Sequence, residues 1–439
     1  MASQSQSQPP NPPPTPAFAP SKAQLQAATT VLTNLVSNPT TTTSSNSQPQ
    51  APTHKSPTTT GYLARLALPQ TSLEDFEASW HLGNYVLDRA TRRKTFEPMS
   101  VYVRLGMHFL YYGARQEAIL HWKASQALLK SQTEALGRTY DSPASKRHIR
   151  PFIESFGLGR SLSELARPDP EQYASFNDFF ARELRSGVRP VEGGEDARVV
   201  CAFADCRLVV FETVGLAVRY WVKGFGFTVG RLLGEEERND HGEPSGKGKG
   251  REQESGGRRT RWAHTFEGGS IAISRLAPQD YHRWHSPIDG VIESITEIPG
   301  TYYTVNPQAI NEAGVLNVFC ENRRSVMIVR RKVGLSQPPS SIVAIVAVGA
   351  MLVGSIKYNP GIVVGAEIKR GQCLGAFQYG GSTVIALFPK GDVVFDQDLV
   401  ANSAEMCCET LVQVGCRIGR GPVEKTLEWK SSPVKVILS

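Results

Sequence analysis

The sequence predicts an α+β protein in which a helical N-terminal portion is followed by a β-rich domain, and a disordered tail precedes both. Residues 1–60 contain no Asp, Glu or Arg and are rich in Ser, Gln, Pro and Thr. Ala-, Leu- and Lys-rich sequence occupies much of 72–135. From residue 199 onward, short runs of β-branched residues alternate with Gly and Pro, as strands and turns do. We therefore expect a tail over 1–60, a helical region over 61–165 and a β-rich domain over 166–439.

The tail cannot bury enough apolar surface to offset its chain entropy, so we expect 1–60 to be disordered. It shares a lack of acidic residues with transit peptides, but its missing Arg and its many prolines argue against one.

The chain of 439 residues has a net charge of +7, a mild basic bias that suits an anionic membrane surface or simple solubility. Seven cysteines without CxxC spacing indicate reduced thiols in a cytosol-facing compartment and no structural zinc site.

Two features of the helical region bear on function. Arg92-Arg93-Lys94 forms a basic cluster, and the aromatic-rich apolar stretch 99–112 follows it. Together they would suit the surface of an anionic membrane. A core helix capped by exposed charges is the alternative, and both interpretations predict helix over 72–135.

The β-rich domain contains one long apolar run and one highly charged insert. The run 341–356 is too short to span a bilayer and carries two Gly, so we expect buried strands there. The segment 234–261 has seven acidic and seven basic residues, which predicts a solvated loop inserted between strands. Its balanced charge, without interleaved aromatic residues, argues against nucleic-acid binding.

Three short segments carry groups that could perform chemistry, and the first is YGGST (379–383). A Ser that follows two Gly at the mouth of a strand has an exposed hydroxyl and a backbone free to adopt unusual dihedral angles. A tight turn stabilised by a hydroxyl hydrogen bond is the alternative. The segment is not the GxSxG elbow of a hydrolase, because Val384 replaces the second Gly and a strand follows.

The second segment, DYHRWH (280–285), has two histidines three residues apart. His282 and His285 could bind a metal together with Asp280, could transfer protons because an imidazole titrates near neutrality, or could be structural. The third segment is ADCR, in which Asp205 precedes a strand. Asp205 is either a turn or cap residue or the group that orients the imidazole of a His–Ser relay.

In content and order these segments resemble those of the phosphatidylserine decarboxylases, pyruvoyl-dependent enzymes that make phosphatidylethanolamine. ADCR and YGGST, in place of ADG and LGST, are similar to the eukaryotic type 2 branch of endosomal, Golgi or vacuolar membranes. Longer members of that branch carry C2 and EF-hand modules, whereas this sequence has no DxDxDG calcium loop. The similar stretches are FNDFFARELRSGVRP (176–190), FADCRLVVF (203–211), LAPQDYHRWHSPIDG (276–290), VGAMLVGSI (348–356) and YGGSTVIALF (379–388).

The resemblance implies a self-cleaving proenzyme that needs neither pyridoxal phosphate nor a metal. His285, oriented by Asp205, deprotonates Ser382, whose hydroxyl attacks the carbonyl of Gly381. The resulting ester eliminates and hydrolyses, which leaves a pyruvoyl group derived from Ser382. A β chain of residues 1–381 and an α chain of residues 382–439 then stay associated. The pyruvoyl carbonyl forms a Schiff base with the substrate amine, CO2 leaves, and His282 donates the returning proton.

Two other functions stay open on the sequence alone. One is a pyruvoyl-dependent decarboxylase of a soluble amino acid, and the other is a non-catalytic binding homologue, against which the intact Asp205, His285, Gly381 and Ser382 argue. The expected partner is phosphatidylserine in an anionic membrane surface, and nucleic acid is not expected. The resemblance implies a peripheral, cytosol-facing enzyme on an endosomal, Golgi or vacuolar membrane, with the mitochondrial inner membrane as the alternative.

Overall fold

A computed structural model gives the fold of most of the chain from residue 83 to residue 421. The predicted tail, the apolar stretch 99–112, most of the charged insert and residues 379–381 lie outside the described residues. Those described are 83–98, 130–131, 134–135, 137–222, 227–235, 262–303, 317–332, 341–349, 355–378 and 382–421.

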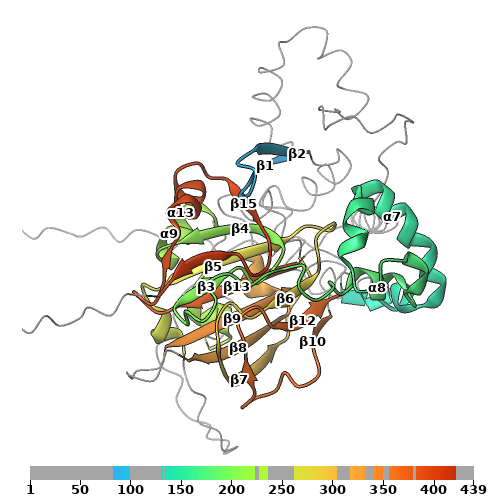
Figure 1. Cartoon of the computed structure of the whole chain (residues 1–439). Coiled ribbons are helices and arrows are strands. Elements are labelled where there is room, and N and C mark those ends of the chain that lie inside the picture. Colours follow the sequence, from blue (N-terminus) through green and yellow to red (C-terminus); the bar gives the residue numbers. More distant parts are fainter. Residues whose placement is uncertain are drawn as a thin grey trace, which may run out of the picture.

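The centre of the molecule is a mixed sheet of ten strands in the order β11-β7-β8-β9-β13-β5-β4-β15-β1-β2. Two three-stranded sheets, β10-β12-β6 and β14-β16-β3, accompany it (Figure 1). The strands of the large sheet are β1 Gly83–Asp88, β2 Lys94–Pro98, β4 Cys206–Phe211, β5 Ser270–Leu276, β7 Gly290–Ile298, β8 Arg324–Arg331, β9 Ile342–Gly349, β11 Glu367–Ile368, β13 Ser382–Phe388 and β15 Glu409–Val412. Those of the small sheets are β3 Val199–Cys201, β6 Arg283–His285, β10 Ile356–Tyr358, β12 Cys373–Phe377, β14 Val394–Phe395 and β16 Arg417–Arg420.

Both faces of the large sheet are covered, as the alternating side chains of β13 show. Ile385 and Leu387 belong to a core shared with α9 Val214–Tyr220, α10 Val229–Leu233 and α12 Val318–Glu321. Val384 and Ala386 belong to a second core, shared with the two small sheets and α13 Gln397–Ala404. Because every residue of β13 is buried, its continuous apolar sequence is the pattern of a central strand rather than of a half-exposed one.

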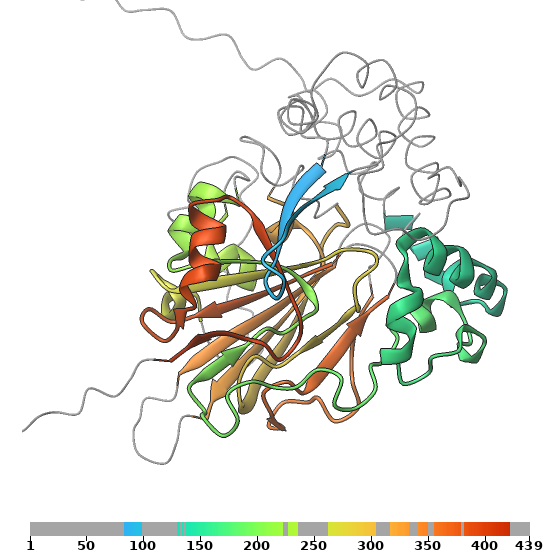
Figure 2. The ribbon, with the colours of Figure 1, turned by 45° about the horizontal axis from the view of Figure 1, so that its top comes forward.

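A helical lobe stands beside one end of the sheets, next to β6 and β12 (Figures 1 and 2). Its own core is built from aromatic side chains, with Phe152 and Phe176 in edge-to-face contact at 5.3 Å between ring centroids. Its helices are η1 Pro143–His148, α7 Ile149–Phe156, η2 Leu158–Glu164, η3 Pro170–Gln172 and α8 Phe176–Phe180; a further short helix, η4 Ala263–Phe266, precedes β5.

The α+β class is confirmed, and the run 341–356 contributes the buried strand β9 and the first residue of β10, as predicted. Helix over 83–98 is wrong, because this segment is the hairpin β1–β2. β1 pairs in parallel with β15 and buries Val86, so the hairpin extends the large sheet. The basic cluster closes the hairpin, with Arg92 at φ 60°. The segment forms a hairpin because β1 pairs with the edge of β15, and the local sequence does not reveal that such an edge is present.

The described residues contain no helix that is both long enough and apolar enough to cross a bilayer.

Candidate active site

The topology brings the three chemistry-bearing segments to the same end of the large sheet. β13 is antiparallel to both neighbours, so Ser382, its first residue, pairs with Leu276 and Gly349 at the last positions of β5 and β9. β4 is antiparallel to β5, which places Asp205, just before β4, at that end too. The histidine segment continues directly from β5. Strands far apart in sequence therefore converge on one rim.

Ser382 is fully buried, and its Oγ has no hydrogen-bond partner among the described residues. Alternation along β13 puts its side chain on the same face as Val384, the face that packs against the sheet containing β6. Buried hydroxyls nearly always form hydrogen bonds, so an unpartnered one calls for an explanation. A hydroxyl kept for a reaction is such an explanation.

His282 is also fully buried and lies in the turn between β5 and β6. Its Nδ1 is 2.9 Å from the carbonyl oxygen of Asp280. Because a carbonyl can only accept, Nδ1 carries the proton and Nε2 is left to exchange one. The ring packs against Phe180 of α8, with 4.0 Å between ring centroids and 40° between the ring planes. The helical lobe thus covers this imidazole.

His285 ends β6 and is largely buried. Its Nδ1 donates to the carbonyl of Gly371 at 2.8 Å, which again leaves Nε2 as the exchangeable nitrogen. Its backbone N–H donates to the carbonyl of Phe203 at 2.7 Å. Since Phe203 lies two residues before Asp205, this bond ties the histidine strand to the ADCR segment.

The carboxylate of Asp205 is bound by Arg189, whose Nη2 approaches Oδ2 to 2.7 Å, and by the backbone N–H of Val414 at 2.8 Å. Arg189 also contacts Glu164 at 2.9 Å. Within the described residues, no hydrogen bond joins Asp205, His285 and Ser382 to one another. The fold brings their segments together, while the predicted relay among their side chains stays a prediction.

The stretch FNDFFARELRSGVRP contains three residues whose contacts the sequence did not reveal. Phe180 covers His282, and Arg189 holds Asp205. Arg182, which is 4% exposed, donates through Nη2 to the carbonyls of Gln279 and Asp280 at 2.9 and 3.0 Å. The only signal was the stretch itself, whose resemblance indicated a family and not which residues it would contact.

Comparison with known proteins shows to which family the chain belongs. The family model described as phosphatidylserine decarboxylase matches residues 176–420, from the first residue of α8 to the last of β16. The chain belongs to this family. Phosphatidylserine decarboxylase proenzyme of Fusobacterium nucleatum is 32% identical over 71% of this chain and 90% of its own length.

Eukaryotic members of the decarboxylase family align over a similar part of the chain. Phosphatidylserine decarboxylase proenzyme 3 of Schizosaccharomyces pombe is 41% identical over 76% of this chain and 31% of its own length. Proenzyme 2 of Oryza sativa is 37% identical over 76% and 48%. These relatives support the type 2 branch, as the resemblance implied. The chain spans about a third to a half of the length of these two proteins.

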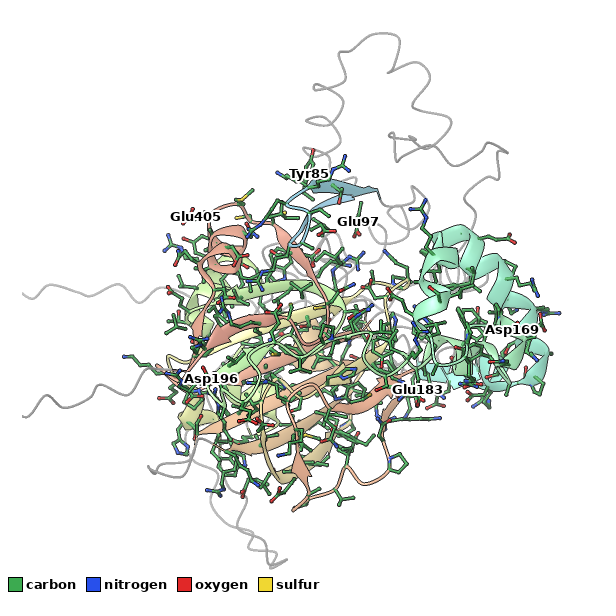
Figure 3. All side chains as sticks on the ribbon, in the orientation of Figure 1. Tyr85, Glu97, Asp169, Glu183, Asp196 and Glu405 are labelled. Carbon is green, nitrogen blue, oxygen red and sulfur yellow. The ribbon has the colours of Figure 1, made fainter. Side chains whose placement is uncertain are left out.

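A cavity of about 350 Å³ lies between the helical lobe and the sheet β10-β12-β6. Its walls carry charges of both signs, including Asp141, Arg283 and Lys357. Gln378 lines it too and donates to Asp141 at 3.2 Å, which links the lobe to the segment before YGGST. Glu183, at the junction of lobe and sheet in Figure 3, pairs with Arg283 at 2.9 Å.

Over the described chain, no cluster of three His, Cys, Asp or Glu side chains could hold a metal ion.

Cys373 pairs in register with His285 across β12 and β6. Burial raises the pKa of its thiol, but interaction with the His285 imidazole and with Arg283 outweighs burial, and the pKa falls to about 7. Burial raises the pKa of Cys201 to about 12 and that of Cys320 to about 11. Among the described cysteines with a shifted pKa, Cys373 alone is shifted downward, so its partly buried thiol is the one best able to form a thiolate near neutrality.

We expect iodoacetamide to alkylate Cys373 roughly ten times faster at about pH 8 than at about pH 6, because the thiolate fraction rises as pH passes through the thiol pKa. Peptide mass spectrometry after short exposure measures the rate at each cysteine. Cys201 and Cys320 serve as unreactive references in the same sample. His285→Ala should slow the reaction of Cys373 at neutral pH; an unchanged rate would show that the imidazole does not activate the thiol.

Proposed function

We propose that this protein is a pyruvoyl-dependent phosphatidylserine decarboxylase, a carboxy-lyase that cleaves itself between Gly381 and Ser382 and then converts phosphatidylserine to phosphatidylethanolamine and CO2. The observation that carries the proposal is the buried, unpartnered hydroxyl of Ser382 at the start of a central strand. Two buried histidines follow the neighbouring strand. Membership of the family supports the same reaction.

In self-cleavage, Nε2 of His285 takes the proton of Ser382, and the Ser382 oxygen attacks the carbonyl carbon of Gly381. The C–O bond forms as the C–N bond to Ser382 breaks, and the freed nitrogen takes a proton. Asp205 stabilises the imidazolium, which requires its carboxylate to turn from Arg189 toward His285. Nδ1 of His285 is meanwhile held by Gly371, so the ring stays oriented.

The ester then eliminates: Ser382 loses its Cα proton and the Cβ–Oγ bond breaks, which releases Gly381 as a carboxylate and leaves an enamine at position 382. The enamine tautomerises to an imine, water adds to it, and ammonia leaves, which gives the pyruvoyl group. No described residue hydrogen-bonds to Ser382 Oγ, so the departure of this oxygen with Gly381 breaks no such bond. The pyruvoyl carbonyl supplies the electron sink for decarboxylation. Because Nδ1 already donates to Asp280, His282 acts as a donor in its doubly protonated form: Nε2 takes up a proton and delivers it to the carbon that loses CO2. Contact with Phe180 covers one side of the ring.

Two features support a phospholipid rather than a soluble amino acid as substrate. The cavity beside the lobe contains cationic and anionic side chains, which suits a zwitterionic headgroup that also bears a phosphate. The basic cluster Arg92-Arg93-Lys94 in the hairpin β1–β2 suits an anionic surface. We propose peripheral attachment to the cytosolic face of an endosomal, Golgi or vacuolar membrane.

The deciding experiment combines mass spectrometry of the purified chain with CO2 release from carboxyl-labelled substrates. We expect two chains, and release from phosphatidylserine in liposomes but not from free serine. Release from free amino acids alone would establish the soluble-substrate alternative. A full-length chain that decarboxylates neither would establish the binding homologue.

We expect the triple variant Arg92→Gln, Arg93→Gln, Lys94→Gln to bind anionic vesicles roughly 100-fold more weakly at low salt, since each basic residue near such a surface contributes about 1 kcal/mol. Self-cleavage should be unchanged, because the hairpin turn is remote from Ser382 in the sheet order. Arg92 is 66% exposed, and its ion pair with Asp398 is 3.5 Å long. Co-sedimentation with vesicles measures the binding.

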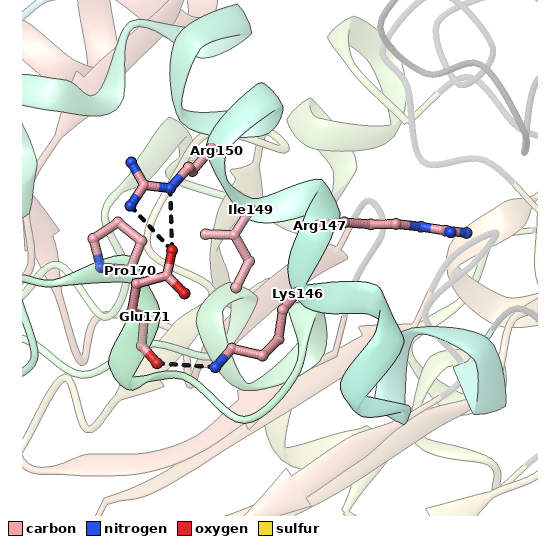
Figure 4. Close-up of a pocket in the computed structure, with 6 residues that line it drawn as sticks. All are labelled: Lys146, Arg147, Ile149, Arg150, Pro170 and Glu171. Atoms are coloured by element: carbon pink, nitrogen blue, oxygen red, sulfur yellow. Dashed lines mark hydrogen bonds and ion pairs between the residues drawn. The ribbon is translucent and has the colours of Figure 1, made fainter.

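A matched control removes three positive charges from the helical lobe, at Lys146, Arg147 and Arg150. Figure 4 shows these residues around a small pocket, where Arg150 pairs with Glu171 at 3.0 Å and Lys146 donates to the Glu171 carbonyl. Equal weakening in both triple variants would indicate a general charge effect. Weakening in the lobe variant alone would place the docking surface on the lobe and contradict the hairpin prediction.

A further inference from the structure

We propose that Arg207 and Asp280 are positioning residues for the decarboxylation step, because together they fix the backbone carbonyl that orients His282. The inference rests on the proposed function and assigns a task to the buried ion pair beside the histidine segment. Arg207 belongs to the ADCR segment, and Asp280 opens the segment DYHRWH. Neither side chain has a part in the self-cleavage reaction.

The side chain of Asp280 is held from two directions. Arg207 Nη1 donates to its Oδ2, and the backbone N–H of Ala277 donates to the same oxygen at 2.7 Å. The side chains of Arg207 and Asp280 are 4% and 11% exposed, so water screens this pair little. The turn from Ala277 to Asp280 is thereby closed by a carboxylate that two donors hold in place.

The other side of the Arg207 guanidinium binds Glu97, with Nε 3.0 Å from Oε2 and Nη2 in contact with Oε1. Glu97 belongs to β2, and Figure 3 shows it beneath the hairpin, toward the sheet. The planar fork of an arginine is needed here, because it must satisfy two carboxylates in different directions at once. A lysine could supply the charge but not this geometry.

The backbone carbonyl of Asp280 is the acceptor for Nδ1 of His282, at 2.9 Å. The same carbonyl accepts from Arg182 Nη2 at 3.0 Å, so its two lone pairs are both used. Arg182 fixes this carbonyl through the main chain, and Arg207 fixes the same residue through its side chain. The ring of His282 is therefore oriented by a carbonyl with almost no freedom, which keeps Nε2 directed at one place.

A second buried arginine beside this network offers a matched control. Arg275 of β5 lies directly opposite Arg207 of β4 and pairs with Glu409 through Nε at 2.7 Å. Its side chain is 13% exposed, and among the described residues no hydrogen bond links it to the turn that carries His282. Replacing either arginine strands a buried carboxylate, so both variants lose stability for the same reason.

The experiment compares Arg207→Met, Asp280→Asn and Arg275→Met as purified two-chain enzymes. We expect all three to self-cleave. In Arg207→Met and Asp280→Asn, kcat for phosphatidylserine in mixed micelles should fall by roughly 10- to 100-fold at nearly constant KM, the effect of a misdirected catalytic group. Arg275→Met should keep kcat within about twofold, although its melting temperature falls as well.

Arg207→Lys keeps the charge without the fork and should give an intermediate kcat. If Arg207→Met fails to fold, Asp280→Asn and Arg207→Lys decide the question. The inference is overturned if kcat is unchanged in the variants that fold, or if Arg275→Met lowers kcat equally. Failure of the wild type to cleave or to decarboxylate would instead refute the proposed function, so the two failures are distinguishable.

Discussion

Ser382→Ala is expected to leave one chain of 439 residues without decarboxylase activity. The substitution removes the oxygen that attacks Gly381, so neither cleavage nor the pyruvoyl group can follow. The wild type should instead separate into chains of 381 and 439 − 381 = 58 residues. Intact-mass spectrometry and denaturing gels measure the split, and the smaller chain should resist Edman degradation because a pyruvoyl cap has no amine.

Thr383→Ala provides the control for this prediction. Thr383 is the next residue of β13, and its hydroxyl is also buried without a partner among the described residues. Thr383→Ala removes a buried hydroxyl, and a methyl group with it, from the same strand but leaves the nucleophile in place. Cleavage of the Ser382→Ala chain at the same bond, or loss of cleavage in both variants, would contradict the assignment of Ser382.

The two histidines are expected to separate self-cleavage from decarboxylation. His285→Ala should stay a full-length chain, because no base remains to take the Ser382 proton. His282→Ala should cleave normally, while its decarboxylation rate falls by at least ~100-fold through loss of the proton donor. Gel analysis reports the first step, and CO2 release from the cleaved enzyme reports the second.

Asp205→Asn completes this series. The amide cannot stabilise an imidazolium, so we expect cleavage slowed less severely than by His285→Ala. In the structure, Asp205 forms an ion pair with Arg189. If Asp205→Asn cleaves as fast as the wild type, the role of Asp205 is limited to this ion pair. Normal cleavage in His285→Ala combined with blocked cleavage in His282→Ala would reverse the two assignments.

Much of the β-rich domain could be predicted from sequence, because central strands buried on both faces leave continuous β-branched runs such as those of β9 and β13. The hairpin β1–β2 could not, since its pairing depends on the edge of β15, more than 300 residues away in sequence. For the site, single residues such as Ser382 and His282 could be proposed from their chemical types. The arginines that bind the site segments could not be predicted, because the partners of Arg189 and Arg207 are set by tertiary contacts alone.

The proposed cleavage immediately before β13 would change how the molecule can refold. β13 is hydrogen-bonded along its length to β5 and β9, and the segment after the cut also supplies β14, α13, β15 and β16. The uncut chain closes this sheet in an intramolecular reaction. Once the bond is broken, the same sheet is a complex of two polypeptides, and its recovery after unfolding becomes bimolecular and dependent on concentration. The proposed cleavage would thus give the protein its activity and end its ability to refold as a single molecule.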